Sequence, residues 1–198
     1  MRKLRIILLR IILVPIIAIM MLVKPSTKPW MTVPTEIAEW AGYIFVLLGF
    51  MLRMWSILYI GQRKSKELII EGPYSVCRDP LYLGTFFIVV GAGLCFENLA
   101  MALCGLMIYI PIHVLVARLE EKHLQEKFGD SYLEYLRTVP SFIPNLKLYK
   151  SPAEISVSVG AIRGATIEGS LIVLIPVIGG LIEFLHQNNL LPIYWRFP

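Results

Sequence analysis

Two groups of polar residues border long apolar runs, where they could carry out chemistry at the edge of a membrane. The first extends from Gly72-Pro73-Tyr74 to Gly84, and the second is the acidic pair Glu120-Glu121. Carboxylates suit ligands that carry ammonium or hydroxyl groups, because hydrogen bonds to ionised acceptors are short and strong. Both groups also have a structural interpretation: Asp79-Pro80 is typical of a helix N-cap followed by proline, and Glu120-Glu121 of a solvated helix surface.

A third candidate is Arg53, which stands inside an apolar run at Leu52-Arg53-Met54-Trp55. An arginine in hydrocarbon costs at least about 2.5 kcal/mol, so it is expected to face a partner or a wet cavity. The alternative is a side chain that reaches the nearer end of its helix. We favour a cation that holds an anionic group. His113, in a later run, suits a hydrogen bond to a neighbouring helix and a catalytic role equally well.

Five apolar runs must position these residues. Of the 198 residues 57% are hydrophobic and only 17% charged, with a mean hydropathy of +0.68. Runs of about 20 apolar residues cross a bilayer as helices. The runs cover approximately residues 4–23, 37–60, 81–97, 99–117 and 167–186, and the third is short. We predict an all-α integral membrane protein with five transmembrane helices, forming a single polytopic membrane domain over residues 1–198.

The placement of charge predicts the orientation of this domain. With five spans, 14 of the 19 basic residues fall at the N-terminus, in the loop after the second span and in the long loop after the fourth. Basic loops stay in the cytoplasm, so we expect a multi-pass protein whose N-terminus and two polar loops are cytoplasmic. The three cysteines form no Cys-x-x-Cys pair, and neither a zinc site nor a disulfide framework is expected.

The polar loops carry their own helix signals. No helix breaker separates the fourth run from Phe128, so that helix should leave the membrane and end at the C-cap Gly129. Ser131-Tyr132-Leu133-Glu134 fits a capping box that opens a short helix ending before Pro140. Residues 152–163 suggest a surface helix. A cytoplasmic pocket would then be formed by loops and helix extensions.

The order of these features resembles the isoprenylcysteine carboxyl methyltransferase family, which is related to the membrane phospholipid methyltransferases. The stretch from Gly72 to Gly84 is followed by a helical hairpin, an acidic helix end, and a segment that runs from Phe128-Gly129 to Pro144. The resemblance covers about residues 40–146, and residues 61–146 contain the catalytic and cofactor motifs. Arg78-Asp79-Pro80 departs from the family pattern, which usually has Arg-His-Pro, so a histidine base is not expected here.

The resemblance implies an integral membrane enzyme that uses S-adenosylmethionine and leaves S-adenosylhomocysteine as product. In that family the cofactor lies in a cytoplasmic pocket, and the lipid substrate enters between helices. Arg53 and Glu121 are the catalytic candidates, Arg53 as a clamp for an anionic substrate. The implied cofactor contacts are Gln62, Lys66, Glu67, Leu68, Ile69, Tyr74, Arg78, Asp79, Pro80, Leu81, Tyr82 and Glu120.

Three functions follow from this interpretation. The preferred one is methyl esterification of a prenylated cysteine or a similar lipid-like carboxylate, because a carboxylate is already an ionised nucleophile near neutral pH. The second is N-methylation of a phospholipid or other lipid, which needs Asp79 or Glu121 to remove a proton. The third is a non-enzymatic membrane protein of transport or assembly. The expected partners are the bilayer and the lipid-like substrate, without nucleic acid or metal.

Overall fold

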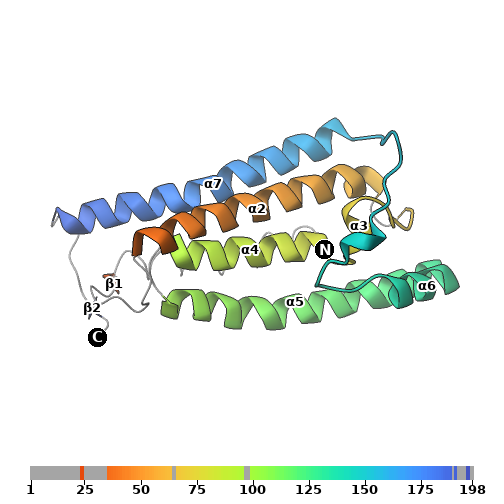
Figure 1. Cartoon of the computed structure of the whole chain (residues 1–198), viewed down its shortest axis with the longest axis horizontal. Helices are drawn as coiled ribbons and strands as arrows, with labels where there is room; N and C mark the ends of the chain where they lie inside the picture. The colour runs from red at the N-terminus through yellow and green to blue at the C-terminus, as the bar shows by residue number, and fades with distance from the viewer. Residues whose placement is uncertain are drawn as a thin grey trace.

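The computed structural model describes residues 23–24, 35–63, 66–95, 99–188, 190 and 195–196. Four long helices form a bundle in which α7 (Val159–Gln187) lies against α2 (Thr35–Ile60), α2 against α4 (Pro80–Cys95), and α4 against α5 (Leu99–Phe128) (Figure 1). The short helical elements are η1 (Gly61–Arg63), α3 (Pro73–Val76), α6 (Asp130–Thr138) and η2 (Leu146–Leu148). Two-residue strands, β1 (Val23–Lys24) and β2 (Trp195–Arg196), pair in parallel.

Within the described residues, two helices are long and apolar enough to cross a membrane, over Ile37–Ile60 and Ala102–Phe128. The third predicted span corresponds to α4, an apolar helix of 16 residues. The fifth corresponds to part of α7, which has 29 residues. The first run, 4–23, lies outside the described residues except for its last residue. The prediction of a helical fold is confirmed, with two helices that could cross a membrane by their length and composition. The five spans and the cytoplasmic pocket stay predictions.

Small residues bring α2 and α4 into close contact. A Cβ atom added to Gly49 would lie 2.5 Å from the carbonyl oxygen of Gly84, and one added to Gly91 would lie 2.7 Å from that of Gly42. Backbones approach this closely only where side chains are absent, which is the usual reason for glycine in membrane helix contacts. The glycines of α2 and α4 therefore mark the place where the two helices approach each other most closely.

The helix ends that border the polar connections all lie at one end of the bundle. The C-terminal end of α2, the start of α4, the end of α5 and the start of α7 all lie at the side of the molecule that carries α3 and α6 (Figure 1). As predicted, α5 continues as one helix through the polar sequence to Phe128. Gly129 then adopts a φ of 55°, which glycine reaches without strain, and α6 begins directly after it.

Two local predictions are wrong. The capping box at Ser131 is absent: α6 begins at Asp130, after Gly129, with no side-chain cap hydrogen bond. Residues 152–163 do not form a helix of their own, because residues 151–158 are irregular and the helix from Val159 continues into the last apolar run. Gly160 and Gly164 lie within this helix and do not end it, since a single glycine only weakens a helix by about 1 kcal/mol.

Candidate functional site

The centre of the site is a pair of segments that hold each other at the polar end of the bundle. We call residues 72–79 the lip and residues 139–151 the strap. The strap runs beside the lip and forms hydrogen bonds with backbone groups of the lip. Two segments far apart in sequence thus form one unit. The backbone bonds are Gly72 N to Lys150 O (2.7 Å), Arg78 N to Pro140 O (2.9 Å), Asp79 N to Ser141 O (3.1 Å) and Asn145 N to Val76 O (2.9 Å).

The acidic end of α5 joins this unit through two side-chain contacts. Nη1 of Arg78 in the lip lies 3.0 Å from Oε1 of Glu121. The hydroxyl of Tyr82, in the first turn of α4, donates to Oε2 of Glu120 at 3.2 Å. The two motifs that stood apart in sequence therefore meet at one end of the bundle. This is the arrangement that a single polar site requires.

Asp79 connects the lip to the strap with its side chain. The hydroxyl of Ser141 donates to Oδ2 of Asp79 at 2.9 Å. Burial raises the pKa of the Asp79 carboxyl to about 6; the bond from Ser141 and the charge of Arg78 oppose this shift, whereas the carboxylate of Glu121 adds to it. Asp79 can therefore change its charge close to neutral pH, which an ordinary aspartate does not do.

Aromatic rings line the apolar side of these carboxylates. The ring of His113 on α5 lies 4.5 Å from that of Tyr82, stacks on Tyr109 at 5.7 Å, and is 5.7 Å from Phe142 of the strap. The Tyr109 hydroxyl donates to the backbone oxygen of Tyr82 at 2.6 Å. Nδ1 of His113 is buried, and no described group forms a hydrogen bond with it. The predicted hydrogen bond to a neighbouring helix is thus not made by this nitrogen.

Arg53 faces α4. Its Nη1 donates to Oγ1 of Thr85 at 2.6 Å and lies 3.5 Å from the backbone oxygen of Leu81. Its Cγ lies over Gly84, where an added Cβ would come within 2.7 Å. The arginine thus has partners on the neighbouring helix, one turn inside the start of α4. The role of clamp for a substrate stays a prediction.

The remaining lip residues are packed rather than open. Tyr74 is buried against Tyr59 and Ile69, and its backbone oxygen accepts a hydrogen bond of 2.7 Å from the Tyr135 hydroxyl on α6. Leu68 packs on the neighbouring cluster that contains Tyr135. These contacts give Tyr74, Leu68 and Ile69 a supporting position under the lip. Pro80 is fully buried where it opens α4.

Two predicted cofactor contacts lie on the exposed rim. Lys66 and Glu67 are exposed, and Glu67 pairs with Arg63, four residues earlier, at 2.7 Å. Gln62 lies in η1, at the end of α2. The structure brings together the predicted residues Arg78, Asp79, Tyr82, Glu120 and Glu121.

The sequence is similar to membrane methyltransferases and to a metal-resistance protein. Residues 37–131 match the family described as phospholipid methyltransferase. The chain is 30% identical to the nickel-cobalt-cadmium resistance protein NccN of Alcaligenes xylosoxydans xylosoxydans, over 79% of this chain and 73% of that protein. It is also 30% identical to the protein-S-isoprenylcysteine O-methyltransferase of Schizosaccharomyces pombe, over 50% of this chain and 47% of that enzyme. The chain belongs to the isoprenylcysteine and phospholipid methyltransferase family.

A third relative widens the chemistry within this methyltransferase family. The phosphatidylethanolamine N-methyltransferase B of Dictyostelium discoideum is 22% identical over 49% of this chain and 54% of that enzyme. The match thus spans about half the length of each of the two relatives that are named as methyltransferases. No solved structure matches the chain.

Four residues that the sequence did not single out complete the site of this family member: Ser141, Phe142, Tyr135 and Tyr109. Tyr135 had a signal, because it belongs to the segment that resembles the family. Ser141 and Phe142 follow Pro140 in a turn-rich segment, and Tyr109 lies within an apolar run, four residues before His113. Nothing in their spacing showed which groups they would contact.

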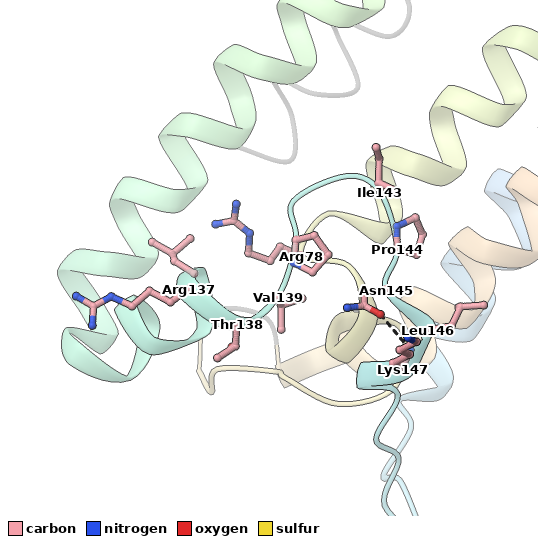
Figure 2. Close-up of a pocket in the computed structure, with 11 residues that line it drawn as sticks. Arg78, Arg137, Thr138, Val139, Ile143, Pro144, Asn145, Leu146 and Lys147 are labelled. Atoms are coloured by element: carbon pink, nitrogen blue, oxygen red, sulfur yellow. Dashed lines mark hydrogen bonds between the residues drawn. The ribbon is translucent and has the colours of Figure 1, made fainter.

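A groove of about 720 Å³ opens beside the strap. Arg78 lies between it and α5, and in Figure 2 the side chain of Arg137 points away from the other labelled residues. The lining contains three cations and no carboxylate. Its residues are Arg78, Leu136, Arg137, Thr138, Val139, Pro140, Ile143, Pro144, Asn145, Leu146 and Lys147.

Proposed function

We propose that this member of the family is an S-adenosylmethionine-dependent membrane methyltransferase that esterifies the carboxylate of a prenylated cysteine or a similar lipid-like acid. One observation carries the proposal: the lip, the strap and the acidic end of α5 form a single polar unit at the end of apolar helices. A polar unit at the edge of exposed apolar helix faces suits a reaction between a soluble cofactor and a lipid.

The side chains of this unit fit S-adenosylmethionine. The ligand carries an ammonium group, ribose hydroxyls and a carboxylate, and Glu120 and Asp79 offer acceptors for the first two. Arg78 lines the groove beside the strap, where its guanidinium suits the ligand carboxylate. When bound, the cofactor supplies a methyl group on a cationic sulphur. The aromatic faces of Tyr82 and Phe142 are suitable neighbours for such a cation.

Arg53 is the proposed substrate clamp. Its guanidinium lies between α2 and α4, one turn inside the polar end, and Thr85 fixes its orientation through the 2.6 Å hydrogen bond. A guanidinium presents its donors in a planar fork that matches the two oxygens of a carboxylate. The arginine would hold one substrate oxygen and aim the other at the methyl group, which is catalysis by positioning. A bound cofactor would supply the methyl group to this oxygen, and an ionised carboxylate has no proton to lose.

N-methylation of a lipid amine is the second candidate, and the raised pKa of the Asp79 carboxyl favours it. An ammonium group must lose a proton before it attacks, which a carboxylate substrate does not need. Asp79, with its pKa raised to about 6, is a stronger base than an ordinary aspartate and lies in the same unit. Glu121 is the other carboxylate that could take the proton, and it forms an ion pair with Arg78 at 3.0 Å.

A binding measurement separates both enzymes from a non-enzymatic membrane protein. We expect isothermal titration calorimetry of the purified full chain in detergent to detect S-adenosylhomocysteine, with adenosine monophosphate as the control ligand. Well-folded protein that binds neither would overturn the proposed function and leave the non-enzymatic class, which the name of the resistance protein NccN keeps open.

Methyl transfer then identifies the acceptor. The chain would be incubated with radiolabelled S-adenosylmethionine and either a farnesylcysteine analogue or phosphatidylethanolamine. Label on the farnesylcysteine that is released by mild base indicates an ester and supports the carboxylate reaction. Base-stable label on phosphatidylethanolamine indicates an amine product and assigns the second candidate.

A further inference from the structure

The strap is fixed at both ends to the apolar part of the bundle. Phe142 packs edge-on against Phe86 of α4 with 5.4 Å between ring centroids, and Tyr149 packs on Trp55 of α2 at 6.0 Å. Phe86 lies six residues after the start of α4, and Trp55 five residues before the end of α2. At about 1.5 Å per residue, both contacts lie roughly 7–9 Å inside the helix ends.

Between these two contacts the strap exposes large apolar side chains. Ile143 is 79% exposed and Leu146 is 77% exposed. The structure holds them in this position: Asn145 donates its backbone N–H to Val76 O at 2.9 Å, and its side chain accepts from the Lys147 N–H at 3.2 Å. In Figure 2 the side chains of Ile143 and Leu146 lie away from Arg137. Exposed apolar side chains on a turn that hydrogen bonds hold in place indicate a surface that contacts a membrane or another molecule.

The surroundings of Ile143 and Leu146 favour a contact with lipid. The apolar faces of α2 and α5 are also exposed, as at Met51 (57%) and Met107 (65%). Because Phe142 and Tyr149 reach below the ends of the apolar helices, Ile143 and Leu146 lie near the depth at which those faces begin. The exposed Lys147 and Lys150 follow them in the sequence. Apolar tips next to lysines are typical of segments that bind an anionic bilayer surface.

We propose that the strap is a membrane-docking surface for anionic phospholipid. Ile143 and Leu146 insert into the boundary between headgroups and acyl chains, and Lys147 and Lys150 contact headgroup phosphates. The docked strap holds the groove between itself and α6 at headgroup level, so that a lipid can approach the site from the bilayer. This inference concerns the position of the strap and does not depend on the methyl acceptor.

Spin-label accessibility tests the depth of the strap. Cysteine would be introduced as Ile143→Cys or Leu146→Cys in the full chain with Cys95→Ser and Cys104→Ser, keeping Cys77, which is 1% exposed. Ser131→Cys, exposed on α6, is the water reference, and Met107→Cys, exposed on α5, is the lipid reference. Collision rates with oxygen and with a water-soluble nickel chelate are measured in nanodiscs of phosphatidylcholine, with and without phosphatidylglycerol.

We expect labels at 143 and 146 to collide several-fold more often with oxygen, and several-fold less with the nickel chelate, than the label at 131. Nickel accessibility equal to that at 131 would place the strap in water and overturn the proposal. Low accessibility to both reagents would indicate a protein contact, such as a second copy, and would overturn it too. Binding of S-adenosylhomocysteine by the same variants reports separately on the proposed function.

A separate comparison tests whether the strap requires anionic lipid. Phosphatidylglycerol should move the label at 146 deeper into the bilayer. The double variant with Lys147→Gln and Lys150→Gln should show the same depth in both nanodisc compositions. The glutamine variants keep the backbone bonds of Lys150 to Gly72 and Ser75, so the strap stays in place. A depth that is the same with and without phosphatidylglycerol in the unsubstituted strap would contradict the anionic-lipid part of the proposal.

Discussion

Adjacent residues of the site have different partners, and the difference suggests different roles. Glu121 forms an ion pair with Arg78, whereas Glu120 accepts from the hydroxyl of Tyr82. An ion pair between two segments fixes their relative position, so Glu121 serves mainly to hold the lip against α5. The contact with Tyr82, whose ring lies against His113, orients Glu120 toward the aromatic side of the site. Glu120 is therefore the better candidate for a direct cofactor contact.

Replacement of Glu120 tests this assignment. Glu120→Ala should weaken S-adenosylhomocysteine binding by about tenfold or more, because hydrogen bonds to charged groups contribute about 1.5–3 kcal/mol. Isothermal titration calorimetry measures the change. Glu126→Ala, which removes an exposed carboxylate of the same helix, is the matched control and should leave the affinity unchanged. Equal affinity for Glu120→Ala and the control would show that Glu120 belongs only to the surface.

Arg53 allows a similar separation of roles. Arg53→Ala should reduce kcat by about 100-fold or more with little change in cofactor affinity, since a cation that positions the substrate is lost. Thr85→Val removes the 2.6 Å hydrogen bond but keeps the charge, so it should reduce kcat far less. Rates come from radiolabel transfer, and the melting temperature checks folding. Full activity of Arg53→Ala would return the residue to a structural role between α2 and α4.

Asp79 gives the site a pH dependence with a defined sign. Its folded-state pKa is raised to about 6, so the folded protein retains a proton that the unfolded chain releases above about pH 4. The stability from this group is therefore greatest below about pH 4 and is lost as the pH rises through about 6. The loss is at most about 3 kcal/mol, and less to the extent that solvent screens the carboxyl.

The neutral variant checks this sign. Asp79→Asn can still accept the hydrogen bond from Ser141, and it has no charge to bury. We expect its melting temperature to change less than that of the original chain between about pH 4.5 and 7.5, and to be higher at the upper end. Asp130→Asn, exposed at the start of α6, is the control. A steeper profile for Asp79→Asn than for the original chain would show that the carboxylate is stabilised in its charged form.

The sequence predicted the helices better than it predicted the contacts between them. Apolar run length predicted α2 and α5, and the lack of a breaker before Gly129 predicted how far α5 extends. The start of α7 was missed because glycines and polar residues weaken the helical pattern there without preventing a helix. The strap was seen only as a turn-rich segment. Its bonds to the lip join residues about 60–80 positions apart, and no local pattern encodes such a pairing.

The contact between α2 and α4 determines the position of Arg53 against α4. Gly49→Ala would place a Cβ 2.5 Å from the Gly84 carbonyl oxygen and 2.8 Å from Cγ1 of Ile88, so the helices would have to separate. We expect a loss of about 1–3 kcal/mol, seen as a lower melting temperature, together with reduced turnover. Gly180→Ala on α7, with no described atom within 4 Å of the added Cβ, should not be destabilising. Equal effects of both variants would contradict the close approach.

At the scale of the whole molecule, the polar connections that carry the family resemblance lie together at one end of the bundle. The loop after α2, the end of α5 and the strap all lie there, and 11 of the 19 basic residues fall between positions 61 and 163 of the sequence. The basic loops are predicted to be cytoplasmic. The cofactor would then reach the site from the cytosol, and the exposed apolar faces of α2 and α5 would admit a lipid from the side.

Cysteine labelling in cells tests this orientation. Ser131→Cys in α6 and Asn98→Cys between the third and fourth apolar runs are introduced separately into the chain with Cys95→Ser and Cys104→Ser. A membrane-impermeant maleimide should label position 98 in intact cells and position 131 only after permeabilisation, because an odd number of crossings separates them. Labelling of position 131 in intact cells would place the lip and the strap outside. The site would then have no access to a cytosolic methyl donor, and the methyltransferase proposal would lose its physical basis.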